Sequence, residues 1–395
     1  MATISCSHST ITLPQEVCGI ICQDEVLAHR DLYALCNLSR AFHVEAEPML
    51  YSSVHLQLMD KIRPFCRTVL HRPHLIKRTH KLVLILPLQS IEPDDLSEIK
   101  KTLHLSTNLR DLRILHSSGA MQGQIGNWAL EDYAFKLTTF VNSYFSTLDI
   151  LRFIEVQSEI KTLVMSHRSL SSHPKKLCPS LENLYCSSQE LSAFGGQLKR
   201  LYIWLTSANF IPLYVNLSYV GSQFGATLTS LSLDLNHIFL GSLNTINGFI
   251  IAVAQYLPRI RFLEIIYDAA TGTNYLMTPQ NLFEFLELET LVLRPSLLLD
   301  EDSTLSSRNV EDHVLIDLRT DVSRMFCAAK IMQSLPTLKN LNLEDAKKNI
   351  SYEFNIASDG NLSFVGSKLA FPKTSLDSMN SLEALDSNWL KIRRV

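Results

Sequence analysis

The sequence predicts an α/β protein in which three short N-terminal helices precede an array of alternating helices and strands. Two observations support this prediction. Residues 13–51 carry apolar side chains at helical spacing between capping residues and prolines, and one six-residue apolar pattern recurs through residues 79–343. With 395 residues, of which 46% are apolar and 19% charged, the chain is long enough to bury a large core.

A first helix is expected to begin at Pro14. Proline suits the first helical position because its missing N–H would have no partner there, and Glu16 then faces the positive end of the helix dipole. Val17, Ile20 and Ile21 follow at helical spacing. The predicted helix therefore has one apolar face.

Two more short helices are expected before residue 52. Asp31 is a candidate cap for the second, in which Leu32 and Leu35 lie on one side, and Ser39 is a candidate cap for the third. We expect Pro48 to end the third helix, because proline cannot continue the hydrogen-bond ladder. Three helices of this length have little interior of their own, so their apolar faces should meet something beyond themselves.

In their order and spacing these elements resemble the F-box, in the form common in fungal proteins. The matching residues are Leu13, Pro14, Glu16, Ile20, Ile21, Asp31, Leu32, Leu35, Ser39, Arg40, Phe42, Pro48, Leu50 and Tyr51. Gly19 departs from the pattern, which usually has a large apolar residue near this position. Glycine also weakens a helix by up to about 1 kcal/mol relative to alanine.

The resemblance implies that residues 10–56 form an F-box domain that binds a Skp-type adaptor protein. The implied adaptor-binding residues are Leu13, Pro14, Ile20, Ile21, Leu32, Leu35 and Leu50. The alternative is that the three helices only cap the domain that follows them. The exposure of these side chains separates the two interpretations, because a cap would bury all of them.

The recurring pattern downstream has the form apolar-x-x-Leu-x-apolar. Each copy predicts a short strand in which every second side chain points inward. A degenerate first copy occupies residues 79–84. Clear copies follow at residues 109–114, 148–153, 160–165, 181–186, 198–203, 228–233, 260–265, 288–293 and 338–343.

Two copies extend further back in register, because Pro258 and Pro336 stand at the same place before them. Each of these units reads as a helix stopped by proline and followed by a strand. The units resemble leucine-rich repeats, and the resemblance implies a solenoid over residues 57–371. Distances of 12 to 50 residues between copies make the array irregular. The alternative is a conventional α/β domain whose strands share a pattern.

The end of the array has two further predicted features. Residues alternate in character on both sides of Asp359-Gly360, which predicts a β-hairpin that covers the last strand edge. Residues 372–395 then read as a C-terminal capping segment, with Leu382, Leu385 and Trp389 on one helical stripe.

The strand residues between the inward leucines should form the concave face of the solenoid. Exposed aromatic and arginine side chains usually anchor interfaces, so this face is the predicted substrate-binding surface. The alternative is that an insertion or a loop covers its rings. The predicted substrate-binding residues are Arg113, Tyr185, Tyr202, Trp204, Glu264 and Arg294.

No catalytic, metal-binding or cofactor-binding pattern appears in the sequence. It has no G-x-S-x-G, H-E-x-x-H or phosphate-binding loop, and its eight cysteines show no repeated pair spacing. Cys18 and Cys22 lie one helical turn apart, but no second pair completes a zinc site. We therefore expect a non-enzyme without metal or cofactor, in a reducing compartment, either cytoplasmic or nuclear.

The charge and hydropathy of the chain argue against nucleic acid and membranes as partners. The net charge of −3 provides no overall field for nucleic acid or an anionic membrane. The longest apolar run, residues 249–254, is far too short to span a bilayer. Partners should therefore be proteins recognised by local shape.

An F-box followed by leucine-rich repeats resembles the substrate receptors of Skp-cullin-F-box ubiquitin ligases. The resemblance implies that the adaptor and a cullin are partners, that the repeats hold a protein substrate, and that other subunits transfer ubiquitin. Two alternatives remain open: a leucine-rich-repeat scaffold with no role in ubiquitin transfer, and an unrecognised hydrolase.

Overall fold

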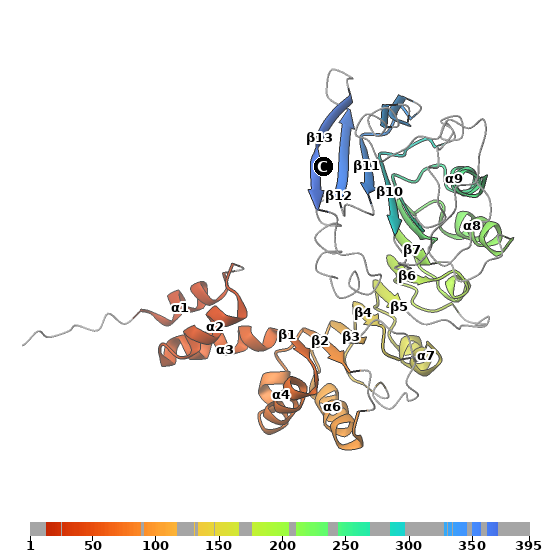
Figure 1. Cartoon of the computed structure of the whole chain (residues 1–395). Coiled ribbons are helices and arrows are strands. Elements are labelled where there is room, and N and C mark those ends of the chain that lie inside the picture. The colour runs from red at the N-terminus through yellow and green to blue at the C-terminus, as the bar shows by residue number, and fades with distance from the viewer. Residues whose placement is uncertain are drawn as a thin grey trace, which may run out of the picture. The chain divides into compact units, whose positions relative to one another are not determined.

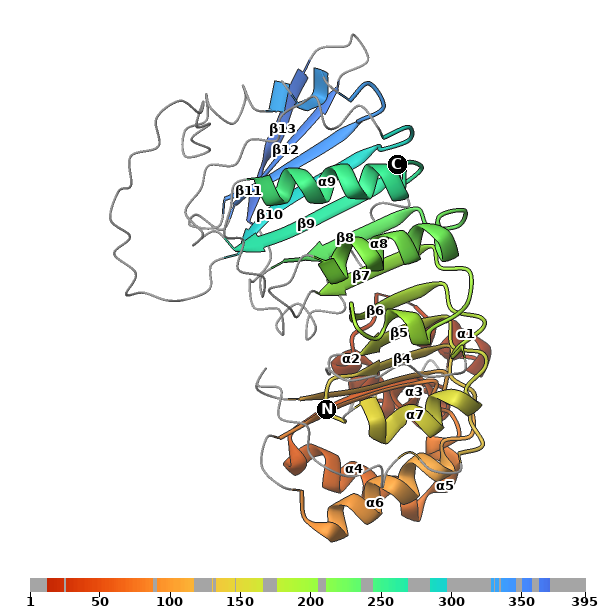
Figure 2. The ribbon, with the colours of Figure 1, turned by 90° about the vertical axis from the view of Figure 1, so that its right-hand side faces the viewer.

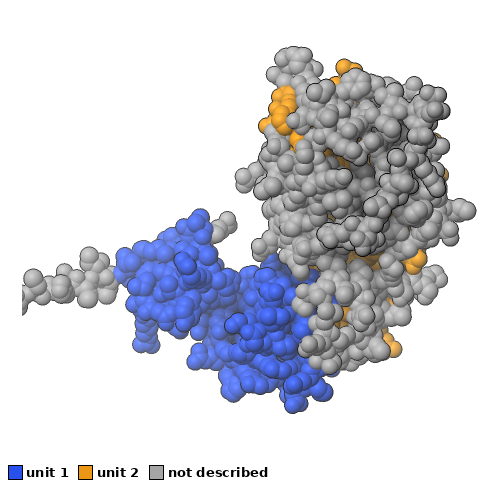
Figure 3. Space-filling view, in the orientation of Figure 1, with its two compact units in different colours: residues 1–117, 128–137 blue, residues 118–127, 138–395 orange. Residues whose placement is uncertain are grey.

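The computed structural model divides the chain into two compact units, residues 1–117 with 128–137 and residues 118–127 with 138–395 (Figure 3). The predicted α/β class is confirmed. The structure describes residues 13–24, 26–87, 91–116, 130, 133–145, 147–165, 176–204, 211–235, 244–268, 285–296, 328–329, 331–333, 335–345, 350–356 and 362–369.

The first unit begins with the three predicted helices, which we call the helical trio. They are α1 (Gln15–Cys22), α2 (His29–Cys36) and α3 (Arg40–Ser52). Ser39 caps α3 as predicted, since its Oγ accepts a hydrogen bond from the backbone N–H of Phe42 at 3.3 Å. Asp31 is not the cap of α2. It lies within the first turn, and its carboxylate accepts from the backbone N–H of Ala28 at 3.0 Å.

The prediction that Pro48 ends the third helix is wrong, because α3 continues through Pro48 to Ser52. Proline removes one helical hydrogen bond, which costs stability but does not forbid the helix. Met49 and Leu50 pack against the core of the trio, and Tyr51 packs against a second cluster formed by α4 and α5. Burial of these side chains offsets the lost hydrogen bond.

Three parallel strands and three helices complete the first unit. In chain order they are β1 (Ser53–Gln57), α4 (Met59–His71), α5 (Pro73–Ile76), β2 (Lys81–Leu86), α6 (Pro93–Leu105) and β3 (Asp111–His116). Helices α4 and α6 lie on the same side of these strands (Figures 1 and 2). Strand β1 begins before the boundary predicted at residue 57, so the helical part ends at Ser52.

The second unit contains a run of parallel strands that ends in an antiparallel hairpin. Helices α7, α8 and α9 cover one side of the parallel strands (Figure 1). The elements are β4 (Thr139–Asn142), α7 (Thr147–Val156), β5 (Thr162–Met165), β6 (Asn183–Ser187), the 3-10 helix η1 (Leu191–Ala193), β7 (Arg200–Trp204), α8 (Ile211–Phe224), β8 (Ser230–Asp234), α9 (Asn244–Tyr256), β9 (Phe262–Asp268), β10 (Thr290–Ser296), β11 (Asn340–Asp345), β12 (Ile350–Ile356) and β13 (Leu362–Leu369).

The central leucines of the repeated pattern form one continuous ladder, which confirms the predicted strand register. Adjacent strands place these leucines directly beside one another, and each is fully buried. The ladder consists of Leu163, Leu184, Leu201, Leu231, Leu263, Leu291 and Leu341.

The prediction of a strand at residues 148–153 is wrong, because this segment lies in helix α7. Its buried residues Ile150, Phe153 and Ile154 have helical spacing, which competes with the strand pattern. The strand of this repeat is β4 instead. There Phe140 takes the place of the ladder leucine beside Leu163, so a pattern that requires leucine misses it.

The predicted C-terminal hairpin is confirmed by its strands. Strand β12 pairs antiparallel with both β11 and β13, and it therefore covers the edge of β11. The turn residues Asp359 and Gly360 lie outside the described residues. The predicted capping segment 372–395, with its stripe of Leu382, Leu385 and Trp389, also lies outside them.

Candidate functional site

The helical trio has a small hydrophobic core of its own. Cys22, Leu32 and Ala46 are buried at its centre, one from each helix. The side chains packed around them are Leu27, Leu35, Cys36, Phe42, Met49 and Leu50. The three short helices therefore share a small core, although little interior was expected of them.

A row of apolar side chains on and just before α1 remains outside this core. Leu13, Val17, Ile20 and Ile21 are exposed, and Ile20 exposes 72% of its surface. The spacing of Val17, Ile20 and Ile21 places these three on one side of the helix, and Leu13 precedes it. We call these four residues the α1 face.

Four more large apolar residues of the trio are exposed, on the segments that follow α1. They are Val26, Tyr33, Leu38 and Val44. Single exposed apolar residues are ordinary in soluble proteins, whereas eight within 32 residues of chain form an unusual concentration. These four residues and Val17 were not among the predicted contact residues. For Val17 the available signal was its helical spacing with Ile20 and Ile21.

The contact between α1 and α3 leaves little room for a larger side chain at Gly19. Gly19 is buried, and a Cβ atom at this position would lie 3.2 Å from Oε2 of Glu45 on α3. The same carboxylate accepts a hydrogen bond from Nε2 of Gln15 at 2.8 Å. A large side chain at residue 19 would displace Glu45, so the inner side of α1 holds only the small residues Cys18, Gly19 and Cys22.

The predicted adaptor-binding residues therefore divide into two groups. Leu13, Pro14, Ile20 and Ile21 are exposed on or beside α1. Leu35 and Leu50 are half-buried against the core, and Leu32 exposes only 7% of its surface within it. Leu32 thus holds the trio together and has little area left for a partner.

The second candidate surface lies on the opposite side of β6 to β10 from the leucine ladder, because side chains alternate along a strand. We call it the aromatic face. It carries Tyr185, Tyr202, Trp204, Ser232, Asp234, Glu264 and Arg294. Tyr185 and Tyr202 are register neighbours whose rings stack with centroids 5.3 Å apart, and Trp204 lies tilted 6.5 Å from Tyr202.

Polar contacts join four strands across the aromatic face. Tyr202 donates from its hydroxyl to Oδ2 of Asp234 at 2.9 Å. Ser232 donates to Oε2 of Glu264 at 2.7 Å, and Nη1 of Arg294 lies 3.1 Å from Oε1 of the same carboxylate. Burial, with the nearby carboxylates of Asp234 and Glu264, raises the pKa of Tyr202 well above its ordinary value. Its hydroxyl is therefore a fixed hydrogen-bond donor at neutral pH.

The structure brings five of the six predicted substrate-binding residues onto this face. Tyr185 and Tyr202 are partly exposed, while Trp204 is buried, so its indole ring mainly packs against its neighbours. Arg113 is different because it lies on β3 in the first unit. It is buried there, and its Nε and Nη2 atoms contact the carboxylate of Asp111 at 3.0 and 2.9 Å.

Metal ligands and reactive thiols are the two kinds of chemical group that the geometry of the described residues bears on. Within them, no group of three His, Cys, Asp or Glu side chains is placed to hold a metal ion. Burial raises the pKa of the Cys66 thiol to about 11 and that of Cys178 to about 12, so both are poor nucleophiles at neutral pH. Across the same ranges, no helix has the length and apolar character to cross a bilayer.

Comparison with known proteins adds no family to these observations. No protein-family model matches the chain, and a search of curated proteins finds no match.

Proposed function

We propose that this protein is a substrate-receptor subunit of a Skp-cullin-F-box ubiquitin ligase. The observation that carries the proposal is the α1 face, an exposed row of four apolar side chains on helices that already have their own core. The folding of the trio does not explain why these side chains are apolar, because its core is formed without them. Exposed apolar area is a common mark of a protein-binding site.

The arrangement of the trio favours a docking function over that of a cap. A cap would bury the apolar residues of α1 against the strands that follow, whereas Leu13, Val17, Ile20 and Ile21 all face outward. Full burial of one such side chain contributes roughly 1.5 to 3 kcal/mol, so a partner that covers this row gains substantial binding energy. In the proposed complex the Skp-type adaptor covers the α1 face.

The aromatic face of the second unit is the proposed substrate-binding surface. Its two partly exposed tyrosine side chains and the Arg294–Glu264 ion pair supply the residue types that usually concentrate binding energy. The mechanism is proximity, in which the receptor raises the local concentration of substrate near the subunits that transfer ubiquitin. The receptor itself supplies no reacting group.

Adaptor binding is tested by replacing Ile20 and Ile21 together with lysine. Lysine suits the C-terminal end of α1, and charges buried in an apolar interface lose hydration without gaining partners. The matched control replaces Val156 on α7 and Val365 on β13, both of which are exposed, with lysine. In co-expression pull-downs with a Skp-type adaptor and a cullin, the first variant should lose both proteins while the control retains them.

Two results would contradict adaptor binding. The unmodified protein would fail to capture the adaptor, or the Ile20 and Ile21 double variant would capture it as well as the control does. Because all four substituted residues are exposed, circular dichroism should show that both variants remain folded.

Substrate binding is tested separately by Tyr185→Ala. Tyr185 is half-exposed, so its loss should weaken capture of ubiquitinated proteins from cells at least tenfold while adaptor capture stays unchanged. Unchanged capture of these proteins would move the substrate site away from the aromatic face.

A further inference from the structure

The sequence of the first unit contains a long segment with one sign of charge. Residues 61–91 include seven lysines and arginines and three histidines, and they contain no aspartate or glutamate. The whole chain has a net charge of −3, so this segment is a local departure from the composition. The structure separates its cations into two groups.

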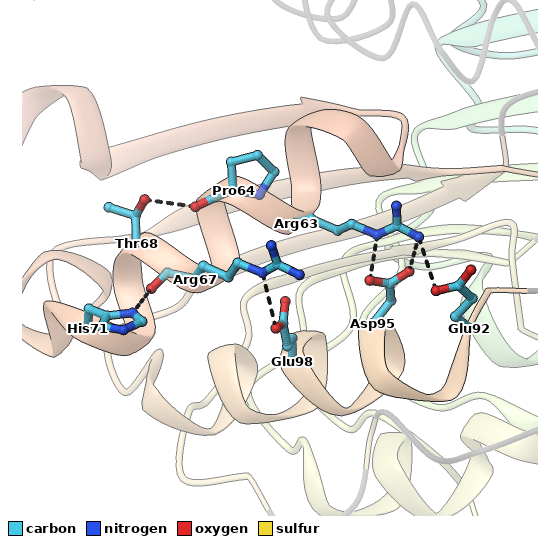
Figure 4. A network of polar contacts seen from close by, with 8 residues as sticks. All are labelled: Arg63, Pro64, Arg67, Thr68, His71, Glu92, Asp95 and Glu98. Atoms are coloured by element: carbon cyan, nitrogen blue, oxygen red, sulfur yellow. Dashed lines mark hydrogen bonds and ion pairs between the residues drawn. The ribbon is translucent and has the colours of Figure 1, made fainter.

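The first group lies on α4, where acidic residues of α6 pair with the arginines (Figure 4). Arg63 contacts both carboxylate oxygens of Asp95 at 2.6 Å and lies 3.5 Å from Glu92. Arg67 lies 3.4 Å from Glu98. These cations hold the two helices together, and their charge is already compensated.

The second group lies on α5 and in the turn before β2. Lys77 and Arg78 are exposed, and neither has an acidic partner among the described residues. His74 and His80 are exposed beside them in sequence, and His80 contacts the backbone carbonyl of Asn108 through Nδ1 at 3.2 Å. We call His74, Lys77, Arg78 and His80 the basic surface.

Lysines that precede strands of the second unit form ion pairs with glutamates. Lys199 and Lys161, which directly precede two strands, lie 2.8 and 3.6 Å from the carboxylate of Glu182. Lys339 lies 3.3 Å from Glu289 in the same way. The lysines directly before these strands of the second unit are therefore paired with a carboxylate. Lys77 and Arg78 lie four and three residues before β2 and have no acidic partner among the described residues.

The two ends of the basic surface limit the size of what it binds. Arg72, which precedes it, lies 3.9 Å from Glu47, and Asp111, beside Lys81 in the sheet register, is held by Arg113. The uncompensated charge is thus limited to Lys77, Arg78 and at most Lys81, with two histidines. Binding of nucleic acid or of an anionic membrane usually engages more cations than this.

The aromatic side chain of this segment packs against another ring and is not available to stack on a base. Phe65 is the one aromatic side chain in residues 61–91, and its ring stacks on Tyr51 with centroids 6.1 Å apart. It therefore offers no platform for a base, which single-stranded nucleic acid binding generally uses.

We propose that the basic surface binds a short acidic segment of a protein, in which carboxylate or phosphate groups contact Arg78 and Lys77. The planar guanidinium of Arg78 suits two oxygens of one carboxylate or phosphate, and Lys77 beside it adds a second charge. The histidines strengthen the binding when protonated. This surface is separate from the α1 face, so the proposal stands whether or not the trio binds an adaptor.

The test measures the fluorescence anisotropy of labelled peptides mixed with the full chain at low salt. One peptide carries four glutamates, a second carries two phosphoserines, and a third has glutamine and serine at the same positions. The unmodified protein should bind the first or the second peptide at least tenfold more tightly than the third. The stronger of the two identifies the source of the negative charge.

Variants then locate the site. Lys77→Glu with Arg78→Glu should weaken binding of the acidic peptide at least tenfold, and Lys77→Gln with Arg78→Gln should weaken it by a smaller factor. The matched control is Lys100→Glu with Lys101→Glu on α6, where acidic residues of the same helix accompany the lysines. The control should change binding less than twofold.

Four results would overturn the proposal. They are equal binding of the charged and neutral peptides, no loss in the Lys77 and Arg78 variants, an equal loss in the control, and tighter binding of a single-stranded oligonucleotide or of phosphatidylserine vesicles than of either acidic peptide. Thermal unfolding verifies that each variant folds, which is expected because Lys77, Arg78 and Lys101 are exposed and Lys100 is half-exposed.

Discussion

The helical trio and the parallel strands of the second unit differ in how far their large apolar side chains are buried. Along the strands, every leucine of the ladder is fully buried between neighbours of the same kind. In the trio, the core is closed by a few residues around Leu32, and the large apolar residues of α1 remain outside it. The same type of side chain therefore stabilises the fold in one region and is available to a partner in the other.

This difference shows why hydropathy alone does not identify a binding surface. Leu32 and Ile20 both lie at helical spacing in the sequence, yet one is 7% and the other 72% exposed. What separates them is which side of each helix faces its two neighbours, and that depends on contacts such as Gly19 against Glu45. Substitutions that remove equal amounts of apolar area should therefore have very different effects in the two regions.

The largest expected effect is in the leucine ladder. Leu291→Ala should lower the free energy of unfolding of the second unit by about 2 to 5 kcal/mol, because the cavity left behind adds to the lost burial. Ile20→Ala, which removes a side chain of the same size from the α1 face, should change stability by less than about 0.5 kcal/mol. Denaturant unfolding of both variants measures the contrast, and equal losses would show that the two regions do not differ as described.

The ladder is also the part of the fold that the sequence predicts best. Each inward leucine has a neighbour of the same kind one strand away, so the pattern repeats and its register can be read without a structure. The pattern fails where Phe140 replaces leucine and where the apolar residues of 148–153 suit a helix as well as a strand. At Phe140 the pattern required a leucine that is absent, and at residues 148–153 the period of the apolar residues was ambiguous and packing decided for a helix.

The candidate sites were less predictable because they depend on contacts between segments. Alternation along β6 and β7 was enough to place Tyr185 beside Tyr202. It did not reveal that Trp204 is buried or that Arg113 is held by Asp111. In the trio, capping rules located α3 correctly at Ser39, but only the packed helices show that Leu32 faces inward.

A smaller effect is expected in the core of the trio, where fewer neighbours surround each residue. Leu32→Ala should destabilise the three helices by about 2 kcal/mol, the lower end of the range for leucine-to-alanine changes. Hydrogen exchange measured by mass spectrometry should show faster exchange in residues 15–52 and unchanged exchange in β6 to β10. Faster exchange throughout both units would contradict an independent core in the trio.

A small effect that depends on charge rather than apolar area is expected at Glu182 in the second unit. Hydrogen bonding with Lys199, followed by the charges of Lys199 and Lys161, lowers the pKa of Glu182 below its ordinary value. A carboxylate with a lowered pKa in the folded state stabilises the fold above the ordinary glutamate pKa, and this contribution is lost as the pH falls through the lowered value. Because Glu182 and both lysines are at least partly exposed, we expect Glu182→Gln to cost only about 0.5 kcal/mol at pH 7.

The pH dependence distinguishes this ion pair from a packing effect of the same size. Thermal unfolding of the unmodified protein and of Glu182→Gln should differ at pH 7, and the difference should shrink as the pH falls through the lowered pKa of Glu182 and its carboxylate takes up a proton. One molar salt at pH 7 should also reduce the difference, since screening weakens exposed charges. A difference that persists at low pH and in high salt would show that Glu182 acts through packing. In that case the paired turns of the second unit would no longer provide a contrast with the uncompensated cations Lys77 and Arg78.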